Sequence, residues 1–499
     1  MDPKSRVPRE VELKFVFESS PGDEVFAWAR AAAPVETRLH AVYFDTQDLT
    51  LHREGLSVRL RQEDGGLIQT VKLRQGGPGA FGRGEWQAAV RGPSLDLDKL
   101  AATPAEQALA EGAGLEPLVD VVTHRRTSRT RTRGCSVELA LDHGEVAAGG
   151  RTARFDELEL ELKSGPARSL FAFANTLQSR FDLGLSFQSK SDRGFALMQA
   201  GAAKSAGFHQ PWLPPSATVG EVFRAMAREC VELIARNAEL FHASPAPEAI
   251  HQMRIGARRL RALIQMFKTA TADARQQAVR AEVRWLGREL ADARDLDVFL
   301  QGAWARAEAR AGEAAASEAR RHFELVRLAA YSRAGAAAGG PRLRRLLMET
   351  LAWIEVGPWT GRRAAAADHR DAPARDFAAR RLGKSRRNLL DAGRHLQRLS
   401  SEKRHEARIE AKKLRYGAEA LVGLFPEASS KASAFVARLK ALQDDLGDLI
   451  DIATAQRLAA DHPVAARLFG KERRREKRLL RDASDHLEAL AAEKRFWKI

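Results

Sequence analysis

The hydrophobic pattern of the chain changes its period near residue 210, and this change constrains the fold more than any other feature. Between residues 10 and 200, segments such as VELKFVF, SVRLR and ELELELK alternate apolar with charged residues, which predicts strands with two unlike faces. From about residue 218 onward, apolar residues recur with a helical period, in segments rich in Ala, Leu, Arg and Glu. We therefore predict an N-terminal α+β domain and a C-terminal all-α domain.

The segment between these halves, GFHQPWLPPSA at residues 207–217, contains three prolines, which interrupt both helices and inner strands. A chain of 499 residues also exceeds what one hydrophobic core usually organises. We predict a domain at residues 1–204, a linker at 205–217 and a helical domain at 218–499. Within these domains we expect helices at about 23–32, 104–112 and 168–181, and loops at 336–341 and 356–376.

The positive charge of the chain belongs to its helical half. Residues 1–200 contain 26 Lys and Arg against 28 Asp and Glu, a net charge of −2, whereas residues 201–499 carry a net charge of +18. A field of this sign concentrates polyanions, so nucleic acid, anionic lipid and polyphosphate are all candidate ligands.

The cysteines and the apolar segments bear on the cellular compartment. Only Cys135 and Cys230 are present, which provides neither a disulfide framework nor a cysteine metal motif. No segment approaches the roughly 18 to 20 consecutive apolar residues of a membrane span. We therefore expect a cytoplasmic protein without a membrane span.

The charged faces of the N-terminal strands are sorted by sign. Residues at i, i+2 and i+4 of a strand share a face, which gives three acidic strands and two basic ones. The acidic faces hold Glu10 and Glu12 with Lys14; Glu138 with Asp142; and Glu157, Glu159 and Glu161 with Lys163. The basic faces hold Arg59 with Arg61, and Lys72. Ordinary solvated faces mix the two signs, and like charges on one face repel unless a ligand neutralises them.

A condensed phosphate that carries a divalent cation could neutralise both the acidic and the basic faces. Guanidinium and ammonium groups bind phosphate oxygens, whereas carboxylates hold Mg²⁺ or Mn²⁺. Strands that close on themselves could turn both sets inward, into a polar interior wide enough for an extended triphosphate.

These motifs resemble those of the CYTH domain, the triphosphate tunnel metalloenzyme family. Its ExExK signature is matched by Glu10, Glu12 and Lys14, and its RxE segment by Arg83 and Glu85. The family implies an eight-stranded antiparallel tunnel that binds a triphosphate with divalent metal. The residues implied in substrate binding are Lys14, Arg59, Arg61, Lys72, Arg125, Arg126, Lys190 and Arg193. Those implied as metal ligands are Glu10, Glu12, Glu85, Glu138, Asp142, Glu159 and Glu161, and those implied in catalysis are Glu10, Glu12, Lys14, Glu159 and Glu161.

A basic helical motif occurs twice in the helical half. HQMRIGARRLR at 251–261 and HEARIEAKKLR at 405–415 share a histidine followed by basic residues three, seven, eight and ten positions later. On the first helix, the histidine and three arginines fall on one face, opposite Leu260, Leu263 and Phe267. The repeat therefore predicts a cationic face and a core face on each helix, within a duplication of about 218–355 and 375–499.

This repeat resembles the CHAD domain, the conserved histidine α-helical domain. The family implies two pseudo-symmetric four-helix bundles whose basic surface binds inorganic polyphosphate, and such binding would associate the protein with polyphosphate granules. The residues implied in polyphosphate binding are His251, Arg254, Arg258, Arg259, Arg261, His405, Arg408, Lys412, Lys413 and Arg415.

Three functions remain open from the sequence. The first is an inorganic triphosphatase with a polyphosphate-binding domain, and the second uses the same tunnel on nucleoside or thiamine triphosphate or as an adenylate cyclase. The third is a polyphosphate-binding protein without catalysis, which the many carboxylates disfavour. Nucleic-acid binding is disfavoured because the basic helices lack interleaved aromatic residues. The oligomeric state is not predicted.

Overall fold

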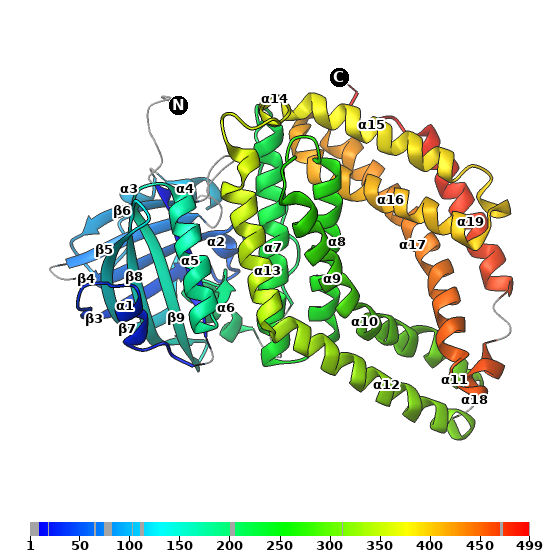
Figure 1. Cartoon of the computed structure of the whole chain (residues 1–499), viewed down its shortest axis with the longest axis horizontal. Coiled ribbons are helices and arrows are strands. Elements are labelled where there is room, and N and C mark those ends of the chain that lie inside the picture. Colours follow the sequence, from blue (N-terminus) through cyan, green and yellow to red (C-terminus); the bar gives the residue numbers. More distant parts are fainter. Residues whose placement is uncertain are drawn as a thin grey trace. The chain divides into compact units, whose positions relative to one another are not determined.

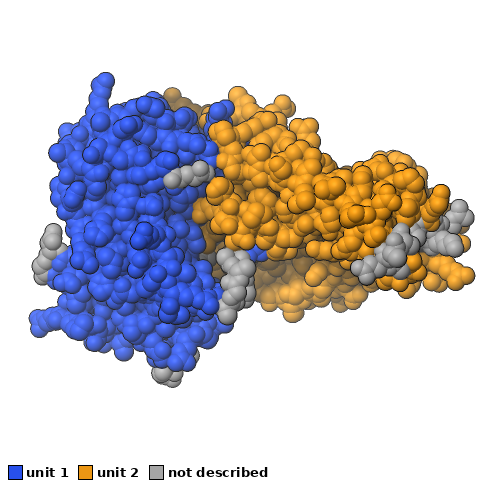
Figure 2. Space-filling view, turned by 90° about the horizontal axis from the view of Figure 1, so that it is seen from below, with its two compact units in different colours: residues 1–205, 344–357 blue, residues 206–343, 358–499 orange. Residues whose placement is uncertain are grey.

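The computed structural model describes residues 9–17, 19–63, 66–73, 82–101, 103–109, 114–199, 205–311, 313–469 and 473–498. The chain divides into two compact units, which Figure 2 distinguishes by colour. The first unit comprises Met1–Ser205 and Arg344–Gly357, and the second comprises Ala206–Leu343 and Pro358–Ile499. A short stretch of the helical half is therefore grouped with the N-terminal half.

One antiparallel sheet, in the order β1-β6-β5-β4-β3-β7-β8-β9-β2-β10, forms the first unit (Figure 1). Its strands are β1 (Arg9–Glu10), β2 (Glu12–Val16), β3 (Val35–Asp45), β4 (Leu56–Glu63), β5 (Gly66–Leu73), β6 (Arg83–Val90), β7 (Glu116–Thr132), β8 (Cys135–Ala148), β9 (Arg151–Ser164) and β10 (Gly184–Ser186). The antiparallel sheet confirms the α+β prediction. The structure divides this sheet into ten strands where the resemblance implied eight, because Val11 interrupts the first strand and the three-residue β10 adds another.

The short segment Arg9–Val16 joins opposite ends of the sheet. β1 pairs with β6 at one end of the strand order, whereas β2 pairs with β9 near the other end. Since a single residue separates β1 from β2, the two ends of the sheet must approach each other. The sheet therefore curls back on itself, and its charged face is turned toward the opposing strands.

Alternation along β9 assigns its two faces. Leu158 and Leu160 are fully buried, and the other face carries Glu157, Glu159 and Glu161. The apolar face of β9 packs against helix α5 (Ala167–Phe181), whose own apolar residues are buried. This amphipathic pairing accounts for the strict apolar and charged alternation in the sequence.

Between residues 9 and 199, the described part of the chain forms six helices that connect or cover the strands. They are α1 (Glu24–Trp28), α2 (Thr50–Arg53), α3 (Leu97–Leu100), α4 (Pro104–Ala108), α5 and α6 (Lys190–Met198). The helices predicted near 23–32, 104–112 and 168–181 are confirmed, the first two in shorter form. Helix α6 was not predicted. Its Phe195 packs against Val119, Val121 and Phe155, on the same sheet face as the charged residues, so one end of that face is apolar and covered.

The regular elements described in the second unit are helices, apart from one isolated bridge between Thr218 and Pro373. Its helices are α7 (Val219–Ala243), α8 (Pro247–Met266), α9 (Gln276–Glu289), α10 (Ala291–Val298), α11 (Ala305–Ala311), α12 (Glu313–Gly339), α14 (Ala367–Asp371), α15 (Ala374–Ala392), α16 (Ser401–Leu421), α17 (Ser429–Ala459), α18 (Pro463–Leu468) and α19 (Arg473–Ala492). Helix α13 (Pro341–Val356) begins in this unit and continues into the other. Short turns of 3-10 helix span Pro358–Thr360, Leu396–Arg398, Val422–Leu424 and Pro426–Ala428, and a π-helix spans Phe299–Trp304.

Packing of the helices follows the duplicated sequence. In the first repeat α8 packs against α7 and α9, and in the second repeat α16 packs against α15 and α17. The predicted core face of α8 is confirmed, because Leu260, Leu263 and Phe267 are buried. Helices α8 and α16, which carry the two copies of the basic motif, also contact each other.

The predicted loops of the helical half are partly wrong. Helix α12 extends to Gly339 and α13 begins at Pro341, so only Gly340 separates them where a loop was expected at 336–341. The alanines of that segment favour a helix, and Pro341 occupies the first turn, where proline is tolerated. The segment 356–376 likewise contains α14 and the start of α15. Across the described ranges, no helix combines the length and the apolar character that a membrane crossing requires.

Candidate functional site

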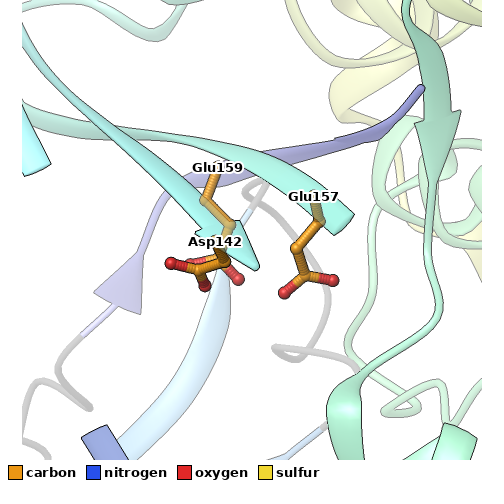
Figure 3. Close-up of side chains that lie close together, drawn as sticks. All are labelled: Asp142, Glu157 and Glu159. Carbon is orange, nitrogen blue, oxygen red and sulfur yellow. The ribbon is translucent and has the colours of Figure 1, made fainter. Parts of the chain in front are cut away.

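Three carboxylates from two neighbouring strands form the centre of the charged face. Asp142 of β8 and Glu157 of β9 are register partners, and Glu159 is two residues further along β9 (Figure 3). One oxygen of each carboxylate lies within 4.8 Å of the others. Asp142 and Glu157 are fully buried, and Glu159 is 14% exposed.

The carboxylates are interlocked with three cations of the chain. Lys14, on β2 opposite Glu159, places its Nζ 3.3 Å from Glu157 Oε1 and 3.1 Å from Glu159 Oε1. Arg125 of β7 donates through Nε and Nη2 to the two oxygens of Asp142, at 2.7 and 2.6 Å, and also bonds Glu159. Lys190, the first residue of α6, is the third cation. Its Nζ lies 2.9 Å from Asp142 Oδ2 and 3.3 Å from Glu159 Oε1, and it also contacts Glu157.

These ion pairs set the protonation states. Burial opposes the charged form of Glu159, yet Lys190, Arg125 and Lys14 together hold its pKa well below the usual range. Burial also opposes ionisation of Asp142, but Lys190 and Arg125 lower its pKa. For Lys190, burial is again the opposing effect, and the neighbouring carboxylates raise its pKa. Both carboxylates are therefore ionised near neutral pH.

The basic strands add further cations to the same face. Arg59 and Arg61 lie on β4, and Lys72 lies on β5 with its Nζ 3.3 Å from Glu85 Oε2. Lys72 contributes to the low pKa of Glu159, and Arg125 contributes to a lowered pKa of Arg61, for which burial and Arg59 are the larger causes. The basic and acidic sets therefore act on each other across the sheet.

Several residues expected at the site lie outside the three-carboxylate cluster, within the described residues. Glu138 and Glu161 share Lys163, whose Nζ lies 3.1 and 2.7 Å from them, and they do not belong to the three-carboxylate cluster. Glu12 is the register partner of Glu161. Arg126 follows Arg125 on β7, so its side chain lies on the opposite face of the sheet, where it pairs with Asp23 and Glu36. Glu10 belongs to β1, but its side chain lies outside the described residues, as does that of Arg83.

The structure adds Tyr43 to the site and gives the positions of Glu157 and Arg193, which the sequence had already named. Glu157 was one of three acidic candidates on one face, and only the β8–β9 register shows that it opposes Asp142. Tyr43 lies with its Oη 3.4 Å from Arg59 Nη1. Burial raises the pKa of Tyr43, but Arg59 and Lys190 outweigh this effect and lower it. Arg193, one turn after Lys190, has its Nη2 3.9 Å from Glu157 Oε2.

The carboxylate cluster has the chemistry of a divalent cation site. All its donors are oxygens, which Mg²⁺ and Mn²⁺ prefer. Glu157 Oε2 is buried, and within the described part of the chain it accepts no hydrogen bond. A buried carboxylate oxygen without a donor is costly, so this atom fits a cation ligand.

The second unit contains a basic cavity of about 700 Å³. Its cationic lining comes from α8, α9, α10, α11, α16 and α19, and consists of His251, Arg254, Arg258, Arg261, Arg284, Arg288, Arg294, Arg306, Arg408, Lys412 and Arg475. Three carboxylates also line it: Asp295, Asp448 and Asp451. The two copies of the basic motif therefore contribute to one cavity.

The cations of this basic cavity are incompletely neutralised. Burial, together with Arg408, Arg258 and Arg254, lowers the pKa of Lys412 to about 7. Burial and Arg294 lower the pKa of His251. Arg254 Nη2 lies 3.5 Å from Asp295 Oδ1, a distance at the limit of a hydrogen bond. An anion entering the cavity would relieve this repulsion.

Four of the predicted polyphosphate residues do not contribute to this lining. Among the described residues, Arg259, His405, Lys413 and Arg415 lie outside the lining of the cavity. Arg259 and Arg415 both bind Glu419, at 2.6 and 3.2 Å, and Lys413 binds Glu410 at 2.6 Å. Five arginines outside the predicted set line the cavity instead: Arg284, Arg288, Arg294, Arg306 and Arg475. The two copies of the basic motif, 251–261 and 405–415, do not include these arginines.

Comparison with known families assigns one domain to each half of the chain. The sequence matches the family model of the CYTH domain over residues 8–195 and that of the CHAD domain over residues 225–460. The chain therefore contains a CYTH domain followed by a CHAD domain.

Individual relatives are similar to each half. The inorganic triphosphatase of Haemophilus influenzae is 28% identical over 195 residues, which cover 38% of this chain and 55% of that protein. The chain thus spans about half the length of this curated relative. The crystal structure of the CHAD domain from the plant Ricinus communis superposes with a TM-score of 0.50 and 27% identity, covering 58% of this chain and 99% of that domain.

Proposed function

We propose that the first unit is a metal-dependent hydrolase of inorganic triphosphate and that the second unit binds inorganic polyphosphate. The observation that carries the first part is the buried cluster of Asp142, Glu157 and Glu159, surrounded by Lys14, Arg125 and Lys190. The printed name of the Haemophilus relative supports inorganic triphosphate as the substrate.

The chain's residues divide into two roles. The cations would bind and orient phosphate oxygens through charge-assisted hydrogen bonds; they are Lys14, Arg59, Arg61, Lys72, Arg125, Lys190 and Arg193. Asp142, Glu157 and Glu159 would hold Mg²⁺ or Mn²⁺. Such an ion, when bound, neutralises phosphate charge and lowers the pKa of a bound water.

The pKa directions favour ligand roles for the central carboxylates. A general base works best when its pKa lies near the working pH, whereas Glu159 and Asp142 have lowered pKa values. They are therefore better as cation ligands than as proton acceptors. Glu12 and Glu161, which are register partners, form a candidate position for a second cation.

Phosphate release with Mg²⁺, Mn²⁺ or EDTA tests the hydrolase. The substrates are tripolyphosphate, ATP and thiamine triphosphate, and we expect the highest rate with tripolyphosphate and none with EDTA. Lys14→Ala should abolish turnover, whereas Lys163→Ala, a lysine on the neighbouring strand that pairs outside the cluster, should retain it. Preference for ATP or thiamine triphosphate would support those substrates instead, and no turnover on any would leave a phosphate-binding domain.

For the second unit, the shared cavity supports one composite binding site rather than one site for each repeat. Arg254 and Arg258 come from α8, and Arg408 and Lys412 from α16, yet all four line the same cavity. The wild-type protein should bind one long polyphosphate chain per molecule. Changing either pair to Gln should abolish this binding. Lys403→Gln, an exposed lysine of α16 paired with Glu406, is the matched control. Half-maximal capacity in either double variant would contradict a composite site.

A cytoplasmic location with association to polyphosphate granules is part of the same proposal. Cys135 and Cys230 are both unpaired and buried, which fits a reducing compartment. Imaging of the tagged protein beside stained granules, in wild type and in the Arg254→Gln, Arg258→Gln variant, tests whether the cavity directs this association.

A further inference from the structure

The charges of the carboxylate cluster balance without any added ion. Asp142, Glu157 and Glu159 provide three negative charges, and Lys14, Lys190 and Arg125 provide three positive charges in direct contact with them; a fourth cation, Arg193, lies farther away, 3.9 Å from Glu157. A buried carboxylate is strongly destabilised when its counterion is lost. The cluster is therefore neutral in the state that the structure describes.

Lys190 occupies a special place among these cations. It is the one cation of the three that contacts all three carboxylates. Lys14 contacts only the two glutamates, and Arg125 contacts Asp142 and Glu159, within the described residues. The ammonium group of Lys190 thus lies where a cation shared by the three carboxylates would lie.

The structure around Lys190 holds it in this position. Ser189 caps α6 and forms a capping box with Asp192, which also lies 3.6 Å from His52. The Lys190 Nζ lies 5.2 Å from the centre of the Phe155 ring, a cation–π distance. The capping box stabilises the first turn of α6, so we assign movement of the ammonium group to the flexible lysine side chain.

We propose that Lys190 substitutes for the divalent cation among Asp142, Glu157 and Glu159 and moves to a phosphate oxygen when the metal enters, so that metal and triphosphate bind cooperatively. This inference rests on the proposed function of the cluster. A divalent ion added to the neutral cluster would leave two uncompensated positive charges in a buried site. A triphosphate supplies the missing negative charge and a new partner for the displaced ammonium group, so each ligand favours the other.

Binding of Mn²⁺ alone, measured by the electron paramagnetic resonance of free Mn²⁺, tests the substitution directly. Lys190→Met removes the competing charge, and we expect it to tighten Mn²⁺ binding at least about tenfold, since like charges a few ångströms apart repel strongly. Lys190→Arg keeps the charge and should bind Mn²⁺ as weakly as wild type. Lys99→Met is the matched control, because Lys99 pairs with Asp96, is not among the cations that contact the three carboxylates within the described residues, and its loss should leave Mn²⁺ affinity unchanged.

The cooperativity is measured on the wild-type protein, so it does not depend on a variant that folds. Mn²⁺ affinity is determined with and without an imido analogue of tripolyphosphate that resists hydrolysis, and the Mn²⁺ that the analogue itself chelates is measured in a protein-free sample and subtracted. We expect the analogue to tighten Mn²⁺ binding to the protein beyond this chelation. Equal Mn²⁺ affinity with and without the analogue, or Lys190→Met that is folded and binds Mn²⁺ no more tightly than wild type, would overturn the inference. Tripolyphosphate turnover by wild type is a separate readout: its absence would refute the hydrolase while Mn²⁺ binding still reports on Lys190.

Discussion

The assignment of the metal ligands is tested by comparing Glu157→Gln with Glu161→Gln. The two glutamates lie on the same face of β9, so the substitutions are matched in chemistry and secondary structure. Glu157 is fully buried and contacts Lys14 and Lys190, whereas Glu161 is 29% exposed and pairs with Lys163. The sequence alone favoured Glu161 over Glu157.

The two substitutions are expected to reduce cation affinity and folding stability by different amounts, because the two glutamates differ in burial and in charged partners. A unit charge about 4 Å from a divalent cation is worth roughly 8 kcal/mol at an effective dielectric constant of about 20, twice the value for two unit charges. Even a third of that energy, about 2.7 kcal/mol, corresponds to about a hundredfold loss of affinity for the cation. Removing one partner of a buried ion pair also costs about 3–5 kcal/mol of folding stability. The Glu161 pair is partly exposed, and such pairs are worth about 0–1 kcal/mol.

The assay combines tripolyphosphate turnover, Mn²⁺ affinity and the thermal unfolding midpoint. We expect Glu157→Gln to lose at least about a hundredfold in turnover and Mn²⁺ affinity and to unfold at a lower temperature. Glu161→Gln should lose about tenfold or less. The reverse order, with Glu161→Gln the more damaging change, would refute the assignment and restore the ligand set inferred from the sequence.

Three further predictions concern other parts of the chain. Since Lys412 has a pKa near 7 and a bound polyanion would restore its charge, polyphosphate affinity should fall as the pH rises from about 6 to about 8.5, and Lys412→Met should lose most of this dependence in a filter-retention assay. A Cβ at Gly194 of α6 would lie 2.1 Å from Val119 Cγ1, so Gly194→Ala should cost about 1–3 kcal/mol in a denaturant titration and reduce tripolyphosphate turnover by shifting α6. Thr218→Ala removes the capping box at the start of α7 and should cost about 1 kcal/mol of helical-unit stability without changing turnover.

The alternating pattern could predict the sheet because each strand has unlike environments on its two faces. In β9, Leu158 and Leu160 pack against α5 while the glutamates face the charged interior, and both requirements are visible in the residues themselves. The same reasoning identified Lys14 and Asp142 as candidates. Strand register was not accessible in this way, since Glu157, Glu159 and Glu161 satisfy the alternation equally. Pairing with β8 distinguishes them, and that pairing depends on the whole sheet.

In the helical half, local pattern predicted helices better than it predicted which side chains share a cavity. The two basic motifs showed which residues lie on a cationic face, but His405 and Arg415 lie on that face outside the lining, within the described residues. Arg284 and Arg475 reach the cavity from α9 and α19, outside the two copies of the basic motif. The π-helix Phe299–Trp304, whose Phe299 also lines the cavity, has no local sequence signal, because its wider turn depends on packing around it.

Product analysis of tripolyphosphate by phosphorus nuclear magnetic resonance tests the central claim most directly. The wild-type protein with Mg²⁺ should convert tripolyphosphate into pyrophosphate and phosphate, and both EDTA and Lys14→Ala should prevent the conversion. Persistence of tripolyphosphate with Mg²⁺ and with Mn²⁺, or conversion that continues unchanged in EDTA or in Lys14→Ala, would contradict metal-dependent hydrolysis at the cluster of Asp142, Glu157 and Glu159.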